Sequence, residues 1–388
     1  MFYFGSFFGG CCSAGEYAPQ LFNKLALRVS SNHKTLKKVH KLSINTNLEK
    51  LSNASGVTGR ESEVRELMIR LMTPYADEII VDKLENVIAV KKGKPNSPKI
   101  MLAAHMDEVG LMVKTITKEG FLQFAKMGGI DDRILPAQKV TIFSRKGMFS
   151  GVVGSKPPHI QKEEERKKVL AYDDLFIDVG AESKEDALAL GVAVGDPVGF
   201  DVKYTSLGKD VVMGKAFDNR AGCVTMIEAL KLMEKTDCTI YAVGTVQEEV
   251  GLRGAGVAAF GVDPDLAIAL DVTIAGDTPG VREFDSSVKI GKGPALTISD
   301  SGLITSPKIL RWLLDSAEEE KIPFQIESGL MGSTDAARIL LSRQGVPCGN
   351  VSVPARYIHS PVGILSIKDI ENSAKLTVAA VNRISKYF

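Results

Sequence analysis

Hydrophobic and polar residues recur along this chain at two spacings, and these spacings predict helices and strands. Between Glu61 and Met72, apolar residues fall at positions i, i+3, i+4 and i+7, which predicts an amphipathic helix. Three short apolar runs follow, EIIVD, NVIAV and KIMLAAH, and each predicts a strand. Helical and strand patterns alternate again from Val211 onward. We therefore expect an α/β fold in which a central mixed sheet is flanked by helices.

Residues 110–205 show a different sequence pattern, in which short runs rich in Val, Phe and Thr are broken by Gly and Pro. The tripeptide RKG at 145–147 predicts a hairpin turn there. The charged stretch QKEEERKK at 161–168 has no apolar periodicity, so we expect a solvated or mobile loop. We expect a small β domain (110–205) inserted into an α/β domain that comprises residues 46–109 and 206–388.

The first 45 residues differ in composition from the rest of the chain. They begin with the aromatic and glycine-rich MFYFGSFFGGCCSAG and continue with a lysine-rich stretch, and Glu16 is their acidic residue. One interpretation is a leader that targets the protein to an organelle, because such leaders are basic and poor in acids. The alternatives are a disordered extension or a start codon placed too early. Folded sequence is expected to begin near Asn45.

Length and charge exclude several classes of protein. The 388 residues, 44% of them hydrophobic, suffice for a large core and two or three domains. The formal net charge of +1 gives no global field that would attract nucleic acid or a membrane surface. No apolar run approaches the roughly 18 residues of a membrane-spanning helix. The 5 cysteines show no disulfide spacing, which favours the reducing cytoplasm.

Residues of metal-binding type follow the predicted strands. In open α/β sheets, ligands gather beyond the carboxyl ends of the strands, so residues distant in sequence can meet there. Two imidazoles and three carboxylates are enough to hold two divalent ions if one carboxylate bridges them. The five candidates, the first four of which each follow a short apolar run, are His105, Asp218, Glu249, Asp271 and His359.

Two further carboxylates stand next to these candidates. Glu248 adjoins Glu249 after a very apolar strand, where two carboxylates repel each other unless cations are present. Neighbouring side chains point apart, so Glu248 is free to act as a base, although an acidic solvated loop is the alternative. Asp107 shares a strand face with His105 and can accept a hydrogen bond from its second ring nitrogen.

Each candidate also has an interpretation without metal. His105 can be a histidine held at a strand end by a carboxylate, and His359 an inert loop histidine. Asp218 and Asp271 can cap the segments that follow them. The joint placement of these residues at strand ends, rather than any one of them, favours a metal site.

With these positions filled, the sequence resembles family forty-two of the metallopeptidases, which includes the TET and glutamyl aminopeptidases. The resemblance runs from about residue 47 to residue 388. The matching stretches are AAHMDEVG, GVVGSKPPH, DLFIDVGA, AFDNRAG, TVQEEVGLRGA, ALDV, GSTDAA and IHSP. It implies that Asp218 bridges two ions, that Glu248 is the general base and that Asp107 supports His105. The remaining implied ligands are His105 and Asp271 on one ion, and Glu249 and His359 on the other.

The resemblance also implies an activity and an assembly. It implies a zinc-peptidase-like fold whose inserted barrel, shaped like a PDZ module, forms dimers that build dodecamers. The implied enzyme removes N-terminal amino acids from peptides. Imidazole and carboxylate ligands suit Zn²⁺, with Co²⁺ and Mn²⁺ as alternatives. Two other functions stay open, namely a di-metal hydrolase of acylated amino acids, dipeptides or glycans, and a non-catalytic assembly protein with structural metal.

Several other residues attract attention without deciding the function. His159 lies in a proline-rich turn and is not expected to bind metal. Thr334 or Asp335 can cap a helix or contact the substrate. Arg220 and Arg253 can either attract an acidic substrate side chain or pair with carboxylates of the chain. The preferred N-terminal residue therefore stays open.

Overall fold

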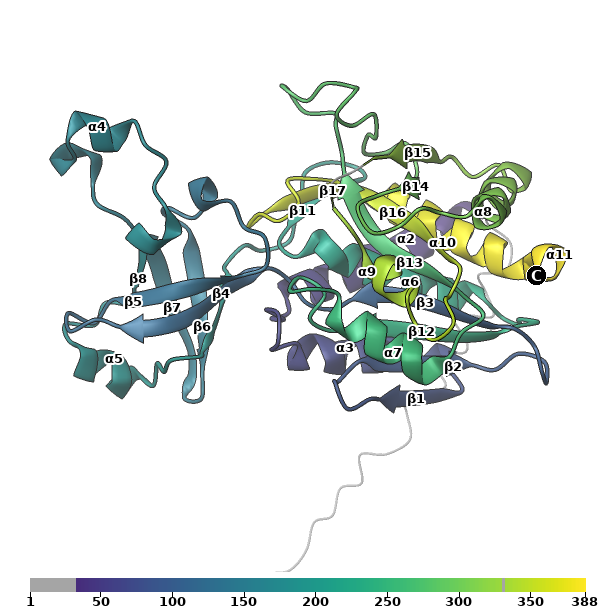
Figure 1. Cartoon of the computed structure of the whole chain (residues 1–388), viewed down its shortest axis with the longest axis horizontal. Helices are drawn as coiled ribbons and strands as arrows, with labels where there is room; N and C mark the ends of the chain where they lie inside the picture. Colours follow the sequence, from purple (N-terminus) through teal and green to yellow (C-terminus); the bar gives the residue numbers. More distant parts are fainter. Residues whose placement is uncertain (1–32, 330–331) are drawn as a thin grey trace, which may run out of the picture. The chain divides into compact units, whose positions relative to one another are not determined.

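An 11-stranded mixed sheet lies at the centre of the computed structural model, which describes residues 33–388 except 330–331. β14 and β15 join its main path through β16 (Figure 1). The strands of the main path, in spatial order, are β1 (Glu78–Val81), β2 (Val87–Lys91), β12 (Thr239–Thr245), β3 (Lys99–His105), β13 (Leu266–Ile274), β16 (Cys348–Arg356), β17 (Gly363–Ser366), β11 (Val211–Gly214) and β10 (Thr205–Ser206). The two additional strands are β14 (Ala295–Ser299) and β15 (Gln325–Ser328).

The four neighbouring strands β12, β3, β13 and β16 are parallel. Thr245, the last residue of β12, lies opposite His105, the last residue of β3. In the next pair, Asp271 of β13 lies opposite Ser352 of β16. Parallel strands in register end at one edge of the sheet, so polar residues at these ends are brought together there.

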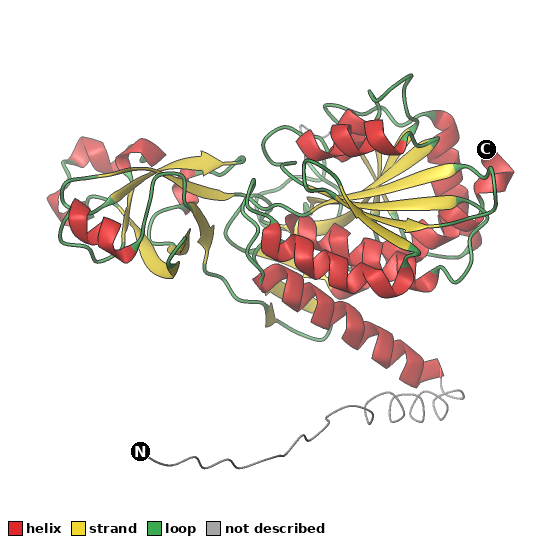
Figure 2. Cartoon of the chain, turned by 90° about the horizontal axis from the view of Figure 1, so that it is seen from below, coloured by secondary structure: helices red, strands yellow, loops and turns green. Residues whose placement is uncertain are grey.

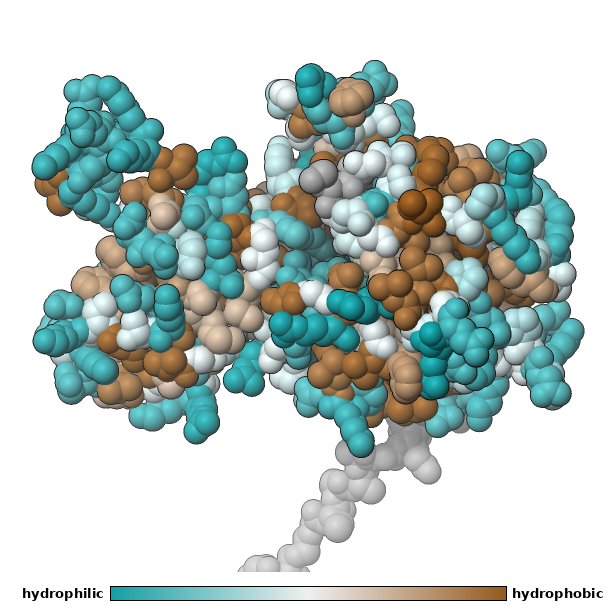
Figure 3. All heavy atoms as spheres, in the orientation of Figure 1, coloured by the Kyte–Doolittle hydropathy of each residue, from teal (hydrophilic) through white to brown (hydrophobic). Residues whose placement is uncertain are grey.

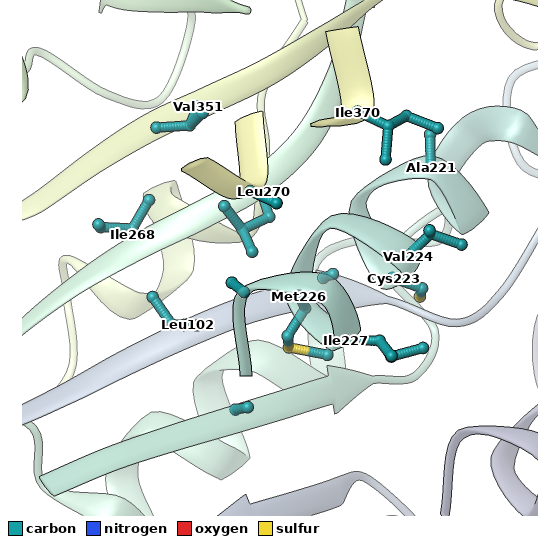
Figure 4. Close-up of a cluster of buried hydrophobic side chains, with 14 of the residues drawn as sticks. Leu102, Ala221, Cys223, Val224, Met226, Ile227, Ile268, Leu270, Val351 and Ile370 are labelled. Atoms are coloured by element: carbon teal, nitrogen blue, oxygen red, sulfur yellow. The ribbon is translucent and has the colours of Figure 1, made fainter. Parts of the chain in front are cut away.

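Helices cover both faces of this sheet (Figure 2). Because both faces are covered, the central strands are apolar almost throughout, and eight of the nine residues of β13 are buried. The main core lies between α6 and the sheet, where Met226 and Ile227 are gathered with Leu102 and Leu270 (Figure 4). The helices are α2 (His33–Asn53), α3 (Ser62–Met72), α6 (Phe217–Leu232), α7 (Arg253–Val262), α8 (Pro307–Glu319), α9 (Asp335–Ile339), α10 (Ile367–Asn382) and α11 (Ile384–Tyr387).

A closed β barrel follows β3 and has a hydrophobic core of its own. Its strands, in spatial order, are β4 (Gly110–Ile116), β5 (Leu122–Met127), β8 (Phe176–Asp178), β7 (Gly147–Gly154), β6 (Lys139–Ser144) and β9 (Pro197–Phe200). Two short helices belong to the same part of the chain, α4 (Glu163–Arg166) and α5 (Lys184–Leu190). The mixed sheet with its flanking helices and the separate barrel confirm the predicted fold class.

One local prediction within the barrel is wrong. Residues 161–168 were expected to form a loop, but they contain the short helix α4. The helix begins after Lys162, whose backbone N–H donates to the side chain of Glu165 at 2.8 Å. Its residues are mainly exposed, and Figure 3 shows hydrophilic side chains where Figure 1 labels α4. The expected hairpin turn is present, because β6 ends at Ser144 and β7 begins at Gly147.

The predicted leader lies mostly outside the described residues, which begin at residue 33. The helix α2 crosses residue 45, where folded sequence was expected to begin. From Ile44 to Phe388 the chain forms one compact unit. Among the described residues, no helix is both long enough and apolar enough to cross a membrane.

Candidate metal centre

The edge of the sheet where β12, β3 and β13 end carries a cluster of histidines and carboxylates. β3 ends in His105, and β13 contributes Asp271 three residues before its end. The turn after β12 carries the two adjacent glutamates, the first turn of α6 carries an aspartate, and the turn after β16 carries the second histidine. The residues contributed by these turns are Glu248, Glu249, Asp218 and His359.

The first imidazole lies close to three carboxylates. Nε2 of His105 is 3.1 Å from Oδ1 of Asp218, 3.8 Å from Oδ1 of Asp271 and 3.9 Å from Oε2 of Glu248. Ligand atoms of His105, Glu248 and Asp271 all lie within 4.8 Å of one another. Glu248 is about as far from this imidazole as Asp271 is, so distance alone does not separate a ligand from a base here.

The second imidazole lies on the other side of Asp218. Nε2 of His359 is 3.4 Å from Oδ2 of Asp218 and 3.4 Å from Oε2 of Glu249. The two carboxylate oxygens of Asp218 therefore face different histidines. Asp218 can therefore offer one oxygen to each side of the cluster.

Asp107 connects this cluster to the turn after β12. Nδ1 of His105 lies 3.1 Å from the carbonyl oxygen of Asp107 and 3.5 Å from its Oδ1. The carboxylate of Asp107 accepts hydrogen bonds from the backbone N–H groups of Glu248 at 3.0 Å and Glu249 at 3.2 Å. It also accepts one from the hydroxyl of Thr58 at 2.8 Å. Asp107 thus lies beside the first imidazole and also fixes the two glutamates.

The electrostatics of the cluster show an excess of negative charge. Burial raises the pKa values of Glu248, Glu249 and Asp271 well above their usual ranges, and neighbouring carboxylates add to the increase. Burial lowers the pKa of His105, but the charge of Glu248 and hydrogen bonds to nearby aspartates outweigh it, so this pKa is raised well above its usual value.

These residues fit divalent cations. Oε1 of Glu249 is buried and has no hydrogen-bond partner among the described residues. An acceptor without a donor, in a group of mutually repelling carboxylates, is costly unless a cation compensates it. Imidazole nitrogens and carboxylate oxygens are the ligands that Zn²⁺, Co²⁺ and Mn²⁺ share.

A cavity of about 760 Å³ opens beside the cluster. It is lined by His105, Asp218 and both glutamates, and it continues past Asp271 to Thr273 and Glu327. Thr334 lines it as well, and the hydroxyl of Thr334 also caps α9 by accepting from the N–H of Ala336. Thr334 therefore caps a helix, as one interpretation of the sequence expected, and its place in the cavity lining also leaves it able to contact a substrate.

The two arginines that were considered for substrate binding do not line this cavity. Arg220 is fully buried, and its guanidinium donates to Glu108 and to the carbonyl oxygen of Met106. Arg253 donates to the side chain of Gln247. Both therefore pair within the chain.

Comparison with known proteins places the chain in a family. The sequence profile of the M42 glutamyl aminopeptidases matches residues 85–376, most of the chain. The chain belongs to the M42 family. The lysyl aminopeptidase of Pyrococcus furiosus is 37% identical over 340 residues, which cover 87% of this chain and 96% of that relative.

Solved structures of TET peptidases are similar to this M42 chain. The TET aminopeptidase of a marine sediment archaeon of the Thaumarchaeota superimposes with a TM-score of 0.86 at 41% identity, covering 88% of this chain and 96% of that one. The Pyrococcus horikoshii TET1 peptidase, which can assemble into a tetrahedron or a large octahedral shell, has a TM-score of 0.79 at 36% identity. That match covers 87% of this chain and 99% of the other. The resemblance seen in the sequence is thereby confirmed, and the chain is a hydrolase of the metal-dependent aminopeptidase class.

One side of the site in this M42 chain is formed by two glycines that were not predicted from the sequence. The turn after β5 brings Gly128 and Gly129 against the cluster. A Cβ atom on Gly128 would lie 3.3 Å from Oε2 of Glu249, and one on Gly129 would lie 3.1 Å from Nδ1 of His359. The adjacent glycines in MGGIDD were the available signal, because paired glycines often mark a close backbone approach.

Proposed function

We propose that this chain removes N-terminal amino acids from peptides with the help of two divalent cations. One cation would be held by His105 and Asp271, the other by Glu249 and His359, with Asp218 shared between them. The observation that carries this proposal is the position of Asp218, whose two oxygens face the two imidazoles at 3.1 and 3.4 Å. Zn²⁺ suits this ligand set best, and Co²⁺ and Mn²⁺ are the alternatives.

When bound, such a pair of cations lowers the pKa of water and polarises the scissile carbonyl group. Glu248 is the residue proposed to move the proton. Its carboxylate lies beside His105 and Asp271, and burial raises its pKa above the usual range, which makes it a stronger base than an exposed glutamate. Glu248 takes a proton from the attacking water and returns it to the leaving amine.

The charge of the site accounts for the choice of the peptide terminus. The free α-amino group of a peptide is cationic, and an internal peptide bond offers no such group. This amino group would bind one of the cations in its neutral form, or pair with a carboxylate at the rim of the site in its charged form. An acylated terminus lacks the charge and is expected to bind more weakly.

A substrate panel tests the proposal. Amino-acid anilides, acylated peptides and cellulose are assayed after chelation and after re-addition of Zn²⁺, Co²⁺ or Mn²⁺. The expected result is cleavage of the free aminoacyl anilides alone, lost on chelation and restored by metal. Comparable cleavage of acylated peptides or cellulose would favour the wider hydrolase function. Full activity in chelator would exclude the metal-dependent mechanism.

We further propose that copies of the chain associate through the barrel and that the dimers build a dodecamer. The assembly of the Pyrococcus horikoshii TET1 peptidase supports this proposal. So do the exposed apolar side chains Met148 and Val152 on β7, which a partner would cover. Sedimentation of the wild type and of Val152→Glu tests it. Smaller particles for the variant support this interface, and unchanged particles contradict it.

A further inference from the structure

The cavity beside the cluster of histidines and carboxylates has a polar floor, whose residues take no part in the proposed chemistry. The floor is built from neighbouring strands β13, β14, β15 and β16. All of its residues are buried, although they carry hydroxyl, amide or carboxyl groups. They are Thr273, Thr297, Glu327, Asn350 and Ser352.

Glu327 is the charged residue of this floor, and it is held firmly. Its Oε2 accepts from the hydroxyl of Thr273 at 2.5 Å, and its Oε1 accepts from the hydroxyl of Thr297 at 2.6 Å. Thr273 is two residues beyond Asp271 on the same strand, so both side chains lie on one face of the sheet. The carboxylate of Glu327 is thus fixed on the same side of β13 as Asp271.

Asp300 stands beside Glu327 and is partly exposed to the cavity. Its Oδ1 accepts from the backbone N–H groups of Gly302 and Leu303, both at 2.7 Å. Its Oδ2 has a long contact of 3.4 Å with the amide of Asn350 and so retains capacity to accept another donor. Burial raises the pKa of Glu327, and the nearby charge of Asp300 adds to this effect.

Among the described residues, neither a lysine nor an arginine lines this cavity to balance these two acids. Arg220 and Arg253, which follow Asp218 and Glu249 in the sequence, pair elsewhere. The other walls are largely apolar, with Leu252, Val281 and Ile358 among them. The cavity therefore combines an apolar passage with an acidic end.

If the first peptide bond lies at the cluster, the side chain of the first residue is the one that can reach the buried end of the cavity. Residues beyond the first must leave the site toward solvent, because the chain continues after the scissile bond. We propose that this floor binds the cationic side chain of an N-terminal lysine or arginine, with Asp300 contacting its charge and Glu327 supplying a second, fixed carboxylate. The apolar walls then pack against the methylene groups. This inference rests on the proposed aminopeptidase function.

Kinetics on the metal-loaded enzyme test the inference. The measured quantity is kcat/KM for lysyl, arginyl, leucyl and glutamyl anilides. Lysyl and arginyl substrates are expected to exceed the glutamyl substrate by about 100-fold, because a second negative charge at this floor is repelled. Asp300→Asn and Glu327→Gln are each expected to lower the ratio of lysyl to leucyl cleavage about 10-fold. Glu283→Gln, which removes an exposed carboxylate outside the cavity, is the control and leaves this ratio unchanged.

A binding experiment separates this inference from the proposed function. The metal-loaded Glu248→Gln variant is titrated with lysinamide and with glutamic acid α-amide in a calorimeter. Tighter binding of lysinamide supports the subsite for a cationic side chain, whether or not the wild type cleaves any anilide. Absence of anilide cleavage by the wild type would count against the proposed function and not against this subsite. Equal binding of the two amides, or equal cleavage of lysyl and glutamyl anilides, would overturn the inference.

Discussion

The carboxylate of Asp107 accepts a hydrogen bond from the backbone N–H of Glu248 at 3.0 Å. Through this bond, a residue that follows β3 positions a residue that follows β12. Oδ1 of Asp107 also lies 3.5 Å from Nδ1 of His105. A histidine of the cluster and the backbone of the proposed base therefore both lie against the same buried carboxylate.

Asp107→Asn is predicted to weaken metal binding. An asparagine keeps the shape of the side chain, but its NH₂ group would face a backbone N–H in place of an acceptor oxygen. We expect metal affinity to fall about 10- to 100-fold, as is typical when a residue that orients a metal ligand is replaced. Competition with a chelator measures this affinity. Asp237→Asn is the control, because Asp237 forms an exposed ion pair with Lys94. Equal affinities in the two variants would contradict the role of Asp107.

Asp218→Ala and His359→Ala are predicted to differ in metal content. Asp218 faces both imidazoles, so its removal should release both cations. His359 contacts only one side of the cluster, and its removal should release one. Mass spectrometry of the intact protein counts the ions that each variant retains. One ion retained by Asp218→Ala would be incompatible with a shared carboxylate.

Glu248→Gln is predicted to retain metal and fold while losing turnover. The amide preserves the size of the side chain but cannot accept the proton. We expect kcat to fall about 10²- to 10⁴-fold, the usual contribution of a general base. Anilide hydrolysis and metal content are measured on the same sample. Near-normal turnover in a metal-loaded variant would remove Glu248 from this role.

Gly129→Ala is predicted to disturb His359 without touching the substrate. The added Cβ would lie 3.1 Å from Nδ1 of His359, closer than an ordinary contact, so the imidazole must move. We expect weaker binding of the cation on the His359 side, measured by calorimetric titration of the metal-free protein. Gly208→Ala is the control, because no heavy atom lies within 4 Å of its added Cβ. Identical titrations for the two variants would refute the close approach.

Asp369 is predicted to make stability depend on pH. Its carboxyl accepts from the N–H groups of Gly291 and Gly293, but burial dominates and raises its pKa from 3.8 to about 6. The folded state therefore binds this proton more tightly than the unfolded state does. The resulting stabilisation is full below pH 4 and is lost as the pH rises through about 6. A shift of this size corresponds to about 2–3 kcal/mol.

Urea unfolding at pH 4.5 and at pH 7.5 checks this sign. Asp369→Asn cannot ionise, so its free energy of unfolding should decrease less between the two pH values than that of the wild type. The exposed Asp173→Asn serves as the control and should follow the wild type. A variant that retains the full pH dependence would show that another group causes it.

Local patterns predicted most of the elements. The apolar spacing of residues 61–72 identified α3, and the short apolar runs identified β2 and β3. Such patterns report which face of a segment is buried, and burial is the main force that selects the segment's structure. The helix α4 has no apolar face, so the spacing of apolar residues could not predict it. It is supported by the hydrogen bond from the backbone N–H of Lys162 to the side chain of Glu165.

The sequence by itself determined the fold class, the family and the residue types available for chemistry. Only the tertiary structure decided which atoms meet. Asp107 and Glu248 are 141 residues apart, and Glu327 and Thr273 are 54 apart, so no local pattern relates them. Parallel pairing of β12, β3 and β13 brings their ends to one edge, and the pairing of β14 with β15 and β16 builds the cavity floor. Hydrophobic periodicity sets which face of a strand is buried, whereas the neighbours of that strand depend on the packing of the whole sheet.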